Sequence, residues 1–208
     1  MFEALVSTSL LNQYAGLVAG GLIEADSGQE AVLMKFEDLR LSLLGINLAR
    51  PAGTFGWLRG PSRREMLIRG LYVWGGAGRG KTMLMDLFYG AAPVERKSRA
   101  HFHEFMTGVH AFVHEWRGAW RNGGVKGDDP VTAAADSIAR KSQLLCFDEF
   151  SVTDIADAMI LGRLFEALFA RGVVIVATSN VRPELLYQDG LNRALFLPFI
   201  AMIGANME

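Results

Sequence analysis

The chain has 208 residues but a single cysteine, Cys146, and no excess of charge, since 21 lysines and arginines balance 22 aspartates and glutamates. One cysteine excludes an internal disulfide framework and a multi-cysteine metal cluster, and it favours a reducing compartment. A net charge of −1 gives no broad basic surface for nucleic acid or an anionic membrane. We therefore expect a cytoplasmic protein that does not bind nucleic acid.

Long apolar runs are absent as well, although the mean hydropathy of +0.20 is high enough to require a search for them. The longest stretch without charge runs from Ala4 to Ile23, and glycines and polar side chains dilute it. No lysine or arginine precedes Lys35, whereas export and import signals need early positive charge. We expect no membrane-spanning segment; peripheral association with a membrane stays open.

The chain does contain enough apolar material for a core, because 50% of its residues are hydrophobic. At roughly 150 residues per domain, its length corresponds to one domain with an attachment. Prolines, glycines and arginines fill residues 50–69, which is typical of a loop or linker. The sequence predicts a helical extension with its linker over 1–66 and one main domain over 67–208.

Short apolar runs alternate with amphipathic stretches along the main domain. Strands are predicted over 71–74, 144–147 and 173–177, with imperfect alternation over 99–105. Fully apolar strands between helices favour a three-layer α/β fold, in which helices cover both faces of a parallel sheet. Helices are predicted from Ser27, in a capping box with Glu30, to Gly45, over 82–89, up to about Trp120, from Asp129-Pro130 and over 151–170.

A glycine-rich loop follows the first strand and fits the pattern G-x-x-x-x-G-K-[ST]. Glycines let the backbone curl until its N–H groups face inward, and the next helix presents its positive N-terminal end there. We expect Lys81 to reach the β- and γ-phosphates of a nucleotide and the Thr82 hydroxyl to bind Mg²⁺. The predicted nucleotide-binding residues are Gly75, Gly76, Ala77, Gly78, Arg79, Gly80, Lys81 and Thr82.

Two acids follow the apolar run that ends at Phe147. Parallel sheets of this class bind their ligands at the carboxyl ends of the strands, where these acids would lie. We expect Asp148 to hold Mg²⁺ together with Thr82, and Glu149 to orient or deprotonate a water that attacks the γ-phosphate. The alternative is that both acids cap the helix predicted over 151–170.

A polar amide, Asn180, follows the strand predicted over 173–177. If this strand lies between the other two, the amide can bond the γ-phosphate or the attacking water. The alternative is an ordinary turn residue ahead of Pro183. A GTPase would show N-K-x-D after this strand, whereas Val181 and Arg182 follow here, so ATP is favoured over GTP.

The order of these motifs resembles that of an AAA+ ATPase, a branch of the P-loop NTPases. More narrowly, about residues 10 to 200 resemble the ZapE cell-division ATPase family and its mitochondrial relatives. This resemblance implies an oligomeric, Mg²⁺-dependent ATPase, linked in bacteria to the division ring and in mitochondria to quality control of membrane complexes. The segments that carry it are RGLYVWG at 69–75, DLFY at 86–89, HFHEFM at 101–106, LCFDEF at 145–150, DIADAM at 154–159 and ATSN at 177–180.

The resemblance also implies a residue that acts on a neighbouring subunit. Arg193 occupies the position of the arginine that completes such sites in trans, where a cation stabilises charge on the γ-phosphoryl oxygens. An exposed helix charge is the alternative. The family further has a last strand beside the phosphate-loop strand and a helical lid, for which we expect no counterpart before Glu208. We therefore expect an exposed sheet edge, weaker nucleotide binding and poorer assembly than in a longer form.

Two hypotheses follow for the function. The first is a Mg²⁺-dependent ATP hydrolase that remodels a protein partner in the bacterial cytoplasm, with Glu149, Asn180 and Arg193 as catalytic residues. The second is a nucleotide-binding module that holds ATP without turnover. All four histidines lie between 101 and 114, and without a zinc-protease pattern we expect structural or inter-subunit roles for them. Cys146, inside an apolar strand, is expected to be inert.

Overall fold

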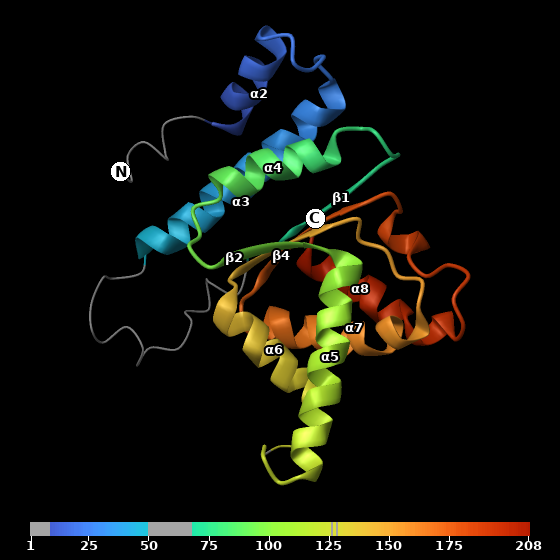
Figure 1. Ribbon diagram of the computed structural model, residues 1–208. Coiled ribbons are helices and arrows are strands. Elements are labelled where there is room, and N and C mark those ends of the chain that lie inside the picture. Colours follow the sequence, from blue (N-terminus) through green and yellow to red (C-terminus); the bar gives the residue numbers. More distant parts are fainter. Residues whose placement is uncertain (1–8, 50–67, 126, 128) are drawn as a thin grey trace.

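The computed structural model describes residues 9–49, 68–125, 127 and 129–208, and Figure 1 shows how they are arranged. The strands are β1 (Leu71–Trp74), β2 (Lys97–His101), β3 (Leu144–Asp148) and β4 (Val174–Ser179). The α-helices are α2 (Leu10–Ala19), α3 (Ser27–Ala49), α4 (Lys81–Ala91), α5 (Phe102–Arg121), α6 (Pro130–Lys141), α7 (Ile155–Ala170) and α8 (Leu197–Asn206). Short 3-10 turns between β4 and α8 are η3 (Pro183–Leu185) and η4 (Arg193–Leu195).

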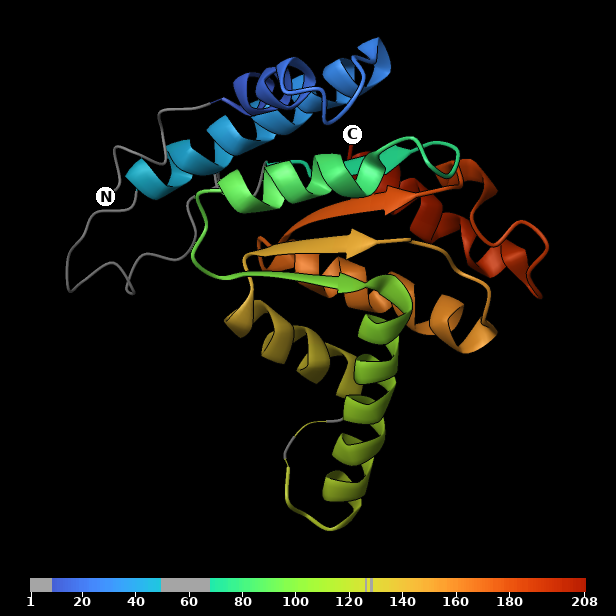
Figure 2. The same cartoon turned by 45° about the horizontal axis from the view of Figure 1, so that its top comes forward.

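Within these residues the strands form one four-stranded parallel sheet in the order β1-β4-β3-β2. Successive side chains of β3 point to opposite faces. Leu145 and Phe147 pack with α5, α6, α7 and α8, whereas Leu144 and Cys146 pack with α2, α3 and α4. Figure 2 shows these two helical layers on opposite sides of the sheet. The predicted three-layer α/β fold is confirmed.

The parallel strands bring three predicted motifs to one edge of the sheet. β1 leads into the glycine-rich loop, β3 ends at Asp148, and β4 is followed by Asn180. In the register of the sheet, Trp74 pairs with Ser179 and Phe147 with Ala177. β4 therefore lies between the phosphate-loop strand and the Asp148 strand, as expected from the sequence.

The first long helix begins at Ser27 as predicted, but its capping residue and its C-terminal end differ from the prediction. α3 begins at Ser27, and the Asp26 carboxylate caps it by accepting a hydrogen bond from the backbone N–H of Gly28 at 2.7 Å. The predicted capping box of Ser27 and Glu30 is therefore wrong. The helix also continues through Gly45, because one glycine costs about 1 kcal/mol, which is too little to end a packed helix.

Later helices confirm one predicted cap and correct another. α6 begins at Pro130 behind its cap Asp129, as predicted. α7 begins at Ile155 rather than at residue 151, because Asp154 is its cap and accepts the N–H of the second helical residue. Asp148, the last residue of β3, and Glu149 therefore do not cap this helix, and their alternative interpretation as helix caps is wrong.

The segment predicted as an imperfect strand over 99–105 divides between two elements. β2 ends at His101, and α5 begins at the next residue, Phe102. The Phe102 side chain is buried, and its ring centroid lies 4.1 Å from that of Phe150. The change from strand to helix thus falls between His101 and Phe102, which period-2 alternation alone did not show.

The N-terminal helices share a core with the main domain. Phe36 of α3 stacks on Phe88 of α4 with ring centroids 4.8 Å apart, and both side chains are fully buried. Leu10 and Tyr14 of α2 belong to the same apolar cluster, which also contains residues of β1. The boundary predicted at residue 66 and the arginine-containing linker lie outside the described residues, so the division of the chain stays a prediction.

The charge-free stretch from Ala4 to Ile23 contains α2, a short helix capped by Ser9. The Ser9 hydroxyl accepts a hydrogen bond from the backbone N–H of Asn12 at 3.2 Å. Within the described ranges, no helix is long and apolar enough to cross a membrane.

The end of the chain corrects the expectation of an exposed edge beside β1. After α8 the backbone turns extended, and Met207 forms a parallel bridge with Gly70. The N–H of Glu208 donates to the Gly70 carbonyl at 3.0 Å, and the N–H of Tyr72 donates to the Glu208 carbonyl at 2.8 Å. Arg69 also donates to the Met207 carbonyl at 2.6 Å. Residues 206–208 therefore pair with the phosphate-loop strand, where the sequence showed too little chain to predict a strand.

Candidate functional site

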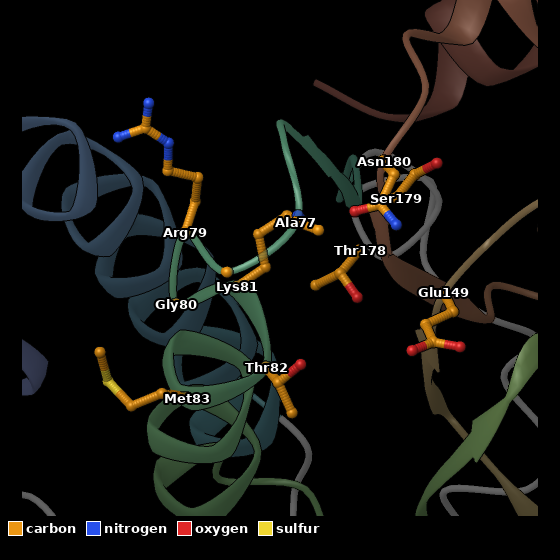
Figure 3. Close-up of a pocket in the computed structure, with 11 residues that line it drawn as sticks. Ala77, Arg79, Gly80, Lys81, Thr82, Met83, Glu149, Thr178, Ser179 and Asn180 are labelled. Atoms are coloured by element: carbon orange, nitrogen blue, oxygen red, sulfur yellow. The ribbon is translucent and has the colours of Figure 1, made fainter.

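A cleft of about 410 Å³ opens where the glycine-rich loop faces the ends of β3 and β4. In Figure 3, Glu149 and Asn180 face Lys81 and Thr82 across this cleft. The structure thus brings together loop residues 77–82 and two of the predicted catalytic residues. The lining residues are Ala77, Gly78, Arg79, Gly80, Lys81, Thr82, Met83, Glu149, Thr178, Ser179 and Asn180.

Two glycines give the loop its curvature. Gly78 and Gly80 have φ angles of +72° and +78°, in the left-handed region where a Cβ costs about 1–2 kcal/mol. The start of the loop is tied to the sheet, because the N–H of Gly75 donates to the Ser179 carbonyl at 3.2 Å. The loop then enters α4, whose first N–H groups have no partner within the helix. Such a helix start binds anions.

Lys81, the first residue of α4, folds back over the loop. Its Nζ donates to the carbonyl oxygens of Gly75 and Gly76, both at 2.7 Å. An ammonium group has three N–H donors, so one remains for an anion in the cleft. Burial lowers the pKa of Lys81 from its usual value. Gly75 and Gly76 do not line the cleft, and they act here by placing this cation.

Arg79 contributes its backbone rather than its guanidinium. Figure 3 shows the Arg79 side chain pointing away from Lys81 and from Glu149 across the cleft. Its carbonyl oxygen accepts a hydrogen bond from Nε2 of Gln29, on the first turn of α3, at 3.2 Å. The sequence did not single out Gln29, because only the fold brings it to the loop.

Asp148, unlike Glu149, is not among the residues that line the cleft, and it is 6% exposed. Arg99 of β2 holds its carboxylate with two hydrogen bonds, from Nε at 2.6 Å and from Nη2 at 3.2 Å. The same guanidinium pairs with Asp86 of α4. Burial opposes the charge of Arg99, but these hydrogen bonds outweigh it and raise its pKa above the usual value. Sequence reasoning missed Arg99, whose only signal was a charge within an imperfectly alternating strand.

The residues around Asp148 fit a magnesium ion held together with a phosphate. Thr82 and Asp148 supply hard oxygen donors, which Mg²⁺ prefers. Arg99 of β2, which holds Asp148, also places its Nη2 3.5 Å from the Thr82 carbonyl oxygen, so β2 adjoins the start of α4. Within the described ranges, no three histidine, cysteine or acidic residues gather into a metal site. Mg²⁺ bound with a nucleotide needs only one or two protein ligands besides substrate phosphates and water, a number that Thr82 and Asp148 can supply.

Glu149 is held in an unusual conformation. Its φ angle of 56° is left-handed, which costs a residue with a side chain about 1–3 kcal/mol. The next residue fixes it, because Phe150 is buried and its N–H donates to the Thr178 carbonyl at 2.7 Å. The Glu149 side chain is 77% exposed, and its Oε2 lies 3.9 Å from Nδ1 of His101. The strain thus presents a solvated carboxylate to the cleft.

The tip of β4 is fixed by buried polar side chains. The Ser179 hydroxyl donates to the Phe150 carbonyl at 2.6 Å and accepts the N–H of Val181 at 3.1 Å. These bonds fix the backbone on either side of Asn180, which is exposed and lines the cleft. Thr178 and Ser179 line the cleft as well. Sequence reasoning did not name these two residues as site residues, although their position at the end of a buried strand could have indicated them.

The structure does not bring Arg193 into the cleft of its own chain. Arg193 opens η4, and its Nη2 donates to the Glu184 carbonyl at 2.6 Å. Its Nε is buried and has no hydrogen-bond partner among the described residues. The neighbouring Leu191 and Leu195 are 69% and 67% exposed. Arg193 therefore belongs to a partly apolar surface apart from the lining of the cleft.

Two of the four histidines lie beside acidic side chains, and the cysteine lies inside a buried strand as the sequence predicts. His110 Nε2 lies 2.7 Å from the Asp157 carboxylate, which joins α5 to α7. His101 is the residue beside Glu149, and the described ranges contain no histidine metal cluster. Cys146 is fully buried, and burial raises the pKa of its thiol to about 12. Such a thiol is unreactive.

Comparison with known sequences identifies the family. The profile of the AFG1-like ATPases matches residues 8–208. The chain belongs to the AFG1-like ATPase family. This AFG1-like chain is 43% identical over 206 residues to the cell division protein ZapE of Escherichia coli K12, which covers 95% of this chain and 52% of ZapE. It is also 51% identical over 138 residues to lactation elevated protein 1 homolog B of Danio rerio. That match covers 65% of this chain and 27% of the Danio rerio protein. The resemblance inferred from the motifs is confirmed.

The AFG1-like chain spans about half the length of ZapE, 52%, and 27% of the length of the Danio rerio protein. Among solved structures, DnaI superimposes with a TM-score of 0.52 and 15% identity, covering 99% of this chain and 89% of DnaI. AMPPCP-bound DnaA from Aquifex aeolicus superimposes with a TM-score of 0.51 and 13% identity, and the match covers 89% of this chain and 47% of DnaA. At these identities the likeness shows the fold alone, a parallel sheet covered by helices on both faces.

Proposed function

We propose that this AFG1-like chain binds ATP with Mg²⁺ and hydrolyses it to ADP and phosphate. The observation that carries the proposal is the meeting, at one cleft, of Lys81 and Thr82 from the loop with Glu149 and Asn180 from two strand ends. ATP is proposed rather than GTP because Asn180 is followed by Val181 rather than by the lysine of N-K-x-D.

Binding begins at the loop. The N–H groups at the start of α4 and the ammonium of Lys81 receive the β- and γ-phosphates, because both present positive charge to the same point. Thr82 and Asp148 would hold Mg²⁺, which when bound neutralises charge between the β- and γ-phosphates. Two loop carbonyls already hold the Lys81 side chain, so it loses little rotamer freedom when it binds a phosphate.

Hydrolysis needs a proton acceptor beside the γ-phosphate. Glu149 takes a proton from water as the water oxygen bonds to the γ-phosphorus, and the bond to the β–γ bridging oxygen breaks with its electron pair leaving on ADP. Asn180 donates an amide N–H to a γ-phosphate oxygen or accepts from the water. The fixed backbone at Phe150 and Ser179 keeps both groups in place.

The test is the substitution Glu149→Gln, which keeps the size of the side chain and removes its basicity. We expect phosphate release to fall at least about 100-fold while ATP still raises the melting temperature. Glu166→Gln, an exposed residue of α7, is the matched control and should release phosphate like the wild type. A wild type no faster than Glu149→Gln would refute the enzyme proposal.

A second function fits the position of Arg193, which bonds its own chain and lies outside the cleft. A single copy then has no arginine at the γ-phosphate, and it would be a module that holds ATP without turnover. In that case ATP raises the melting temperature, but phosphate release stays absent at every protein concentration.

We further propose that the chain acts as a homo-oligomer in the bacterial cytoplasm and couples turnover to remodelling of a protein partner. The name of ZapE, a cell division protein, supports a division-ring partner. No nucleic acid partner is proposed, and peripheral association with a membrane stays open. Coupling predicts that Glu149→Gln, with ATP bound, retains division-ring proteins that Lys81→Ala does not. Equal retention by both variants would contradict it.

A further inference from the structure

The N-terminal helices reach the phosphate loop through one side chain. Gln29 on the first turn of α3 donates from Nε2 to the Arg79 carbonyl at 3.2 Å, across 50 positions of sequence. The same amide lies against the next residue, since a Cβ on Gly80 would meet Nε2 at 2.8 Å. Gly80 is the N-cap residue that directly precedes α4. The contact is therefore made at the junction of loop and helix.

A buried tyrosine orients that amide. Tyr14 of α2 is 2% exposed, and its hydroxyl donates to Oε1 of Gln29 at 3.1 Å, the nearer of its two acceptors, since the Glu24 carbonyl oxygen lies at 3.4 Å. The hydroxyl also accepts the N–H of Asp26, the cap of α3, at 3.0 Å. With its oxygen turned to Tyr14, the Gln29 amide must present its NH₂ group to the loop. The chain Tyr14–Gln29–Arg79 thus joins α2, α3 and the loop.

We propose that Gln29, oriented by Tyr14, is a positioning residue that holds the phosphate loop in its anion-binding shape. The carbonyl it contacts lies between Gly78 and Gly80, both in the left-handed region. Glycine permits many other backbone conformations there, and a donor on a packed helix selects one of them. A loop ordered beforehand loses less conformational freedom when an anion binds.

The first test needs no nucleotide. Hydrogen exchange of residues 75–82 and trypsin cleavage after Arg79 both report loop order. We expect both to be faster in Gln29→Ala and in Gln29→Glu, which keeps the acceptor for Tyr14 but has no N–H to give. Glu30→Ala, the exposed neighbour, should match the wild type. Unchanged rates in both Gln29 variants would overturn the proposal even if the chain bound no ATP.

The second test rests on the proposed nucleotide binding and compares ATP with tripolyphosphate, which has phosphates but no base or ribose. If Gln29 orders the loop, Gln29→Ala weakens both ligands by the same factor, about 5- to 10-fold for one hydrogen bond. A loss confined to ATP would show that Gln29 contacts the base or ribose and would overturn the positioning role. If the wild type binds neither ligand, the proposed function fails, while the exchange test still decides this inference.

Tyr14→Phe checks the orientation step. Because Tyr14 is buried, the melting temperature and far-UV circular dichroism of the Tyr14→Phe variant are measured first, to establish that it folds. In a folded variant, the proposal predicts faster exchange over 75–82 and no further increase when Gln29→Ala is added. Additive increases would mean that the two residues act separately and would overturn the orienting role of Tyr14.

Discussion

Arg99 shows how a single residue outside the motifs can govern a residue inside them. Its guanidinium holds the Asp148 carboxylate through two hydrogen bonds and also pairs with Asp86 on the phosphate-loop helix. The side chains of Arg99 and Asp148 are 19% and 8% exposed, whereas that of Asp86 is 61% exposed. The two halves of this network should therefore differ in energy.

We predict that Arg99→Gln lowers the free energy of unfolding by about 3–5 kcal/mol, because it leaves the buried Asp148 charge without its partner. Asp86→Asn should cost less than about 1 kcal/mol, since that pair is largely solvated. Urea unfolding without nucleotide measures both. Addition of ATP and Mg²⁺ should stabilise Arg99→Gln more than the wild type. Equal losses in the two variants would show that burial does not set the energy of this network.

At the residue scale, sequence patterns predict functional groups only where the chemistry is local. Lys81 and Thr82 are fixed by spacing within one loop, and Asp148 by its place after an apolar strand. Arg99 and Gln29 act through partners 49 and 50 positions away. No short pattern contains both members of such a pair, so only the packing of β2 and α3 shows what these residues touch.

Among the elements, α2 and α3 are joined by an ionised glutamate. Glu37 Oε2 accepts the N–H of Leu10 at 3.2 Å and also a hydrogen bond from Arg40. Arg40 is 4% exposed, and its hydrogen bond lowers the pKa of Glu37 from the usual value. The ionised carboxylate thus favours the folded state, in which α2 covers α3 and the Tyr14–Gln29 contact can form.

The sign of the pH dependence follows from the lowered pKa. Glu37 contributes its stability fully above its usual pKa of about 4.3, and that contribution is lost as the pH falls through the lower folded value. We predict that Glu37→Gln loses about 1.5–3 kcal/mol at about pH 7, and that its difference from the wild type shrinks on acidification. Urea unfolding at several pH values measures this. The exposed Glu30→Gln is the control, and a constant difference across pH would contradict the prediction.

The elements themselves were largely predictable, and the errors lie at their ends. Buried strands such as β3 are continuous apolar runs, which a sequence shows directly. The start of α7 was misplaced because Ser151 and Asp154 are both good caps by type, and only the backbone shows which one accepts the N–H. The pairing of Glu208 with Tyr72 involves so few residues that no strand pattern exists to predict it.

On the scale of the whole molecule, two cations line the cleft among the described residues, Lys81 and Arg79, and only Lys81 turns its side chain toward Glu149 and Asn180. Arg193 is turned toward Glu184, on a surface with Leu191 and Leu195 exposed beside it. The proposed homo-oligomer would cover them and place Arg193 of one copy at the cleft of the next.

Subunit mixing tests that arrangement. Arg193→Ala keeps its own cleft but supplies no arginine, and we expect its phosphate release to fall about 1,000-fold or more. Lys81→Ala cannot hold ATP but still carries Arg193, so each variant alone should be inactive. If Arg193 acts in trans, an equimolar mixture regains activity, because Lys81→Ala copies complete the clefts of Arg193→Ala copies. The regained rate should rise with protein concentration, since it depends on assembly. A mixture no more active than the sum of its parts would mean that Arg193 serves its own chain or none.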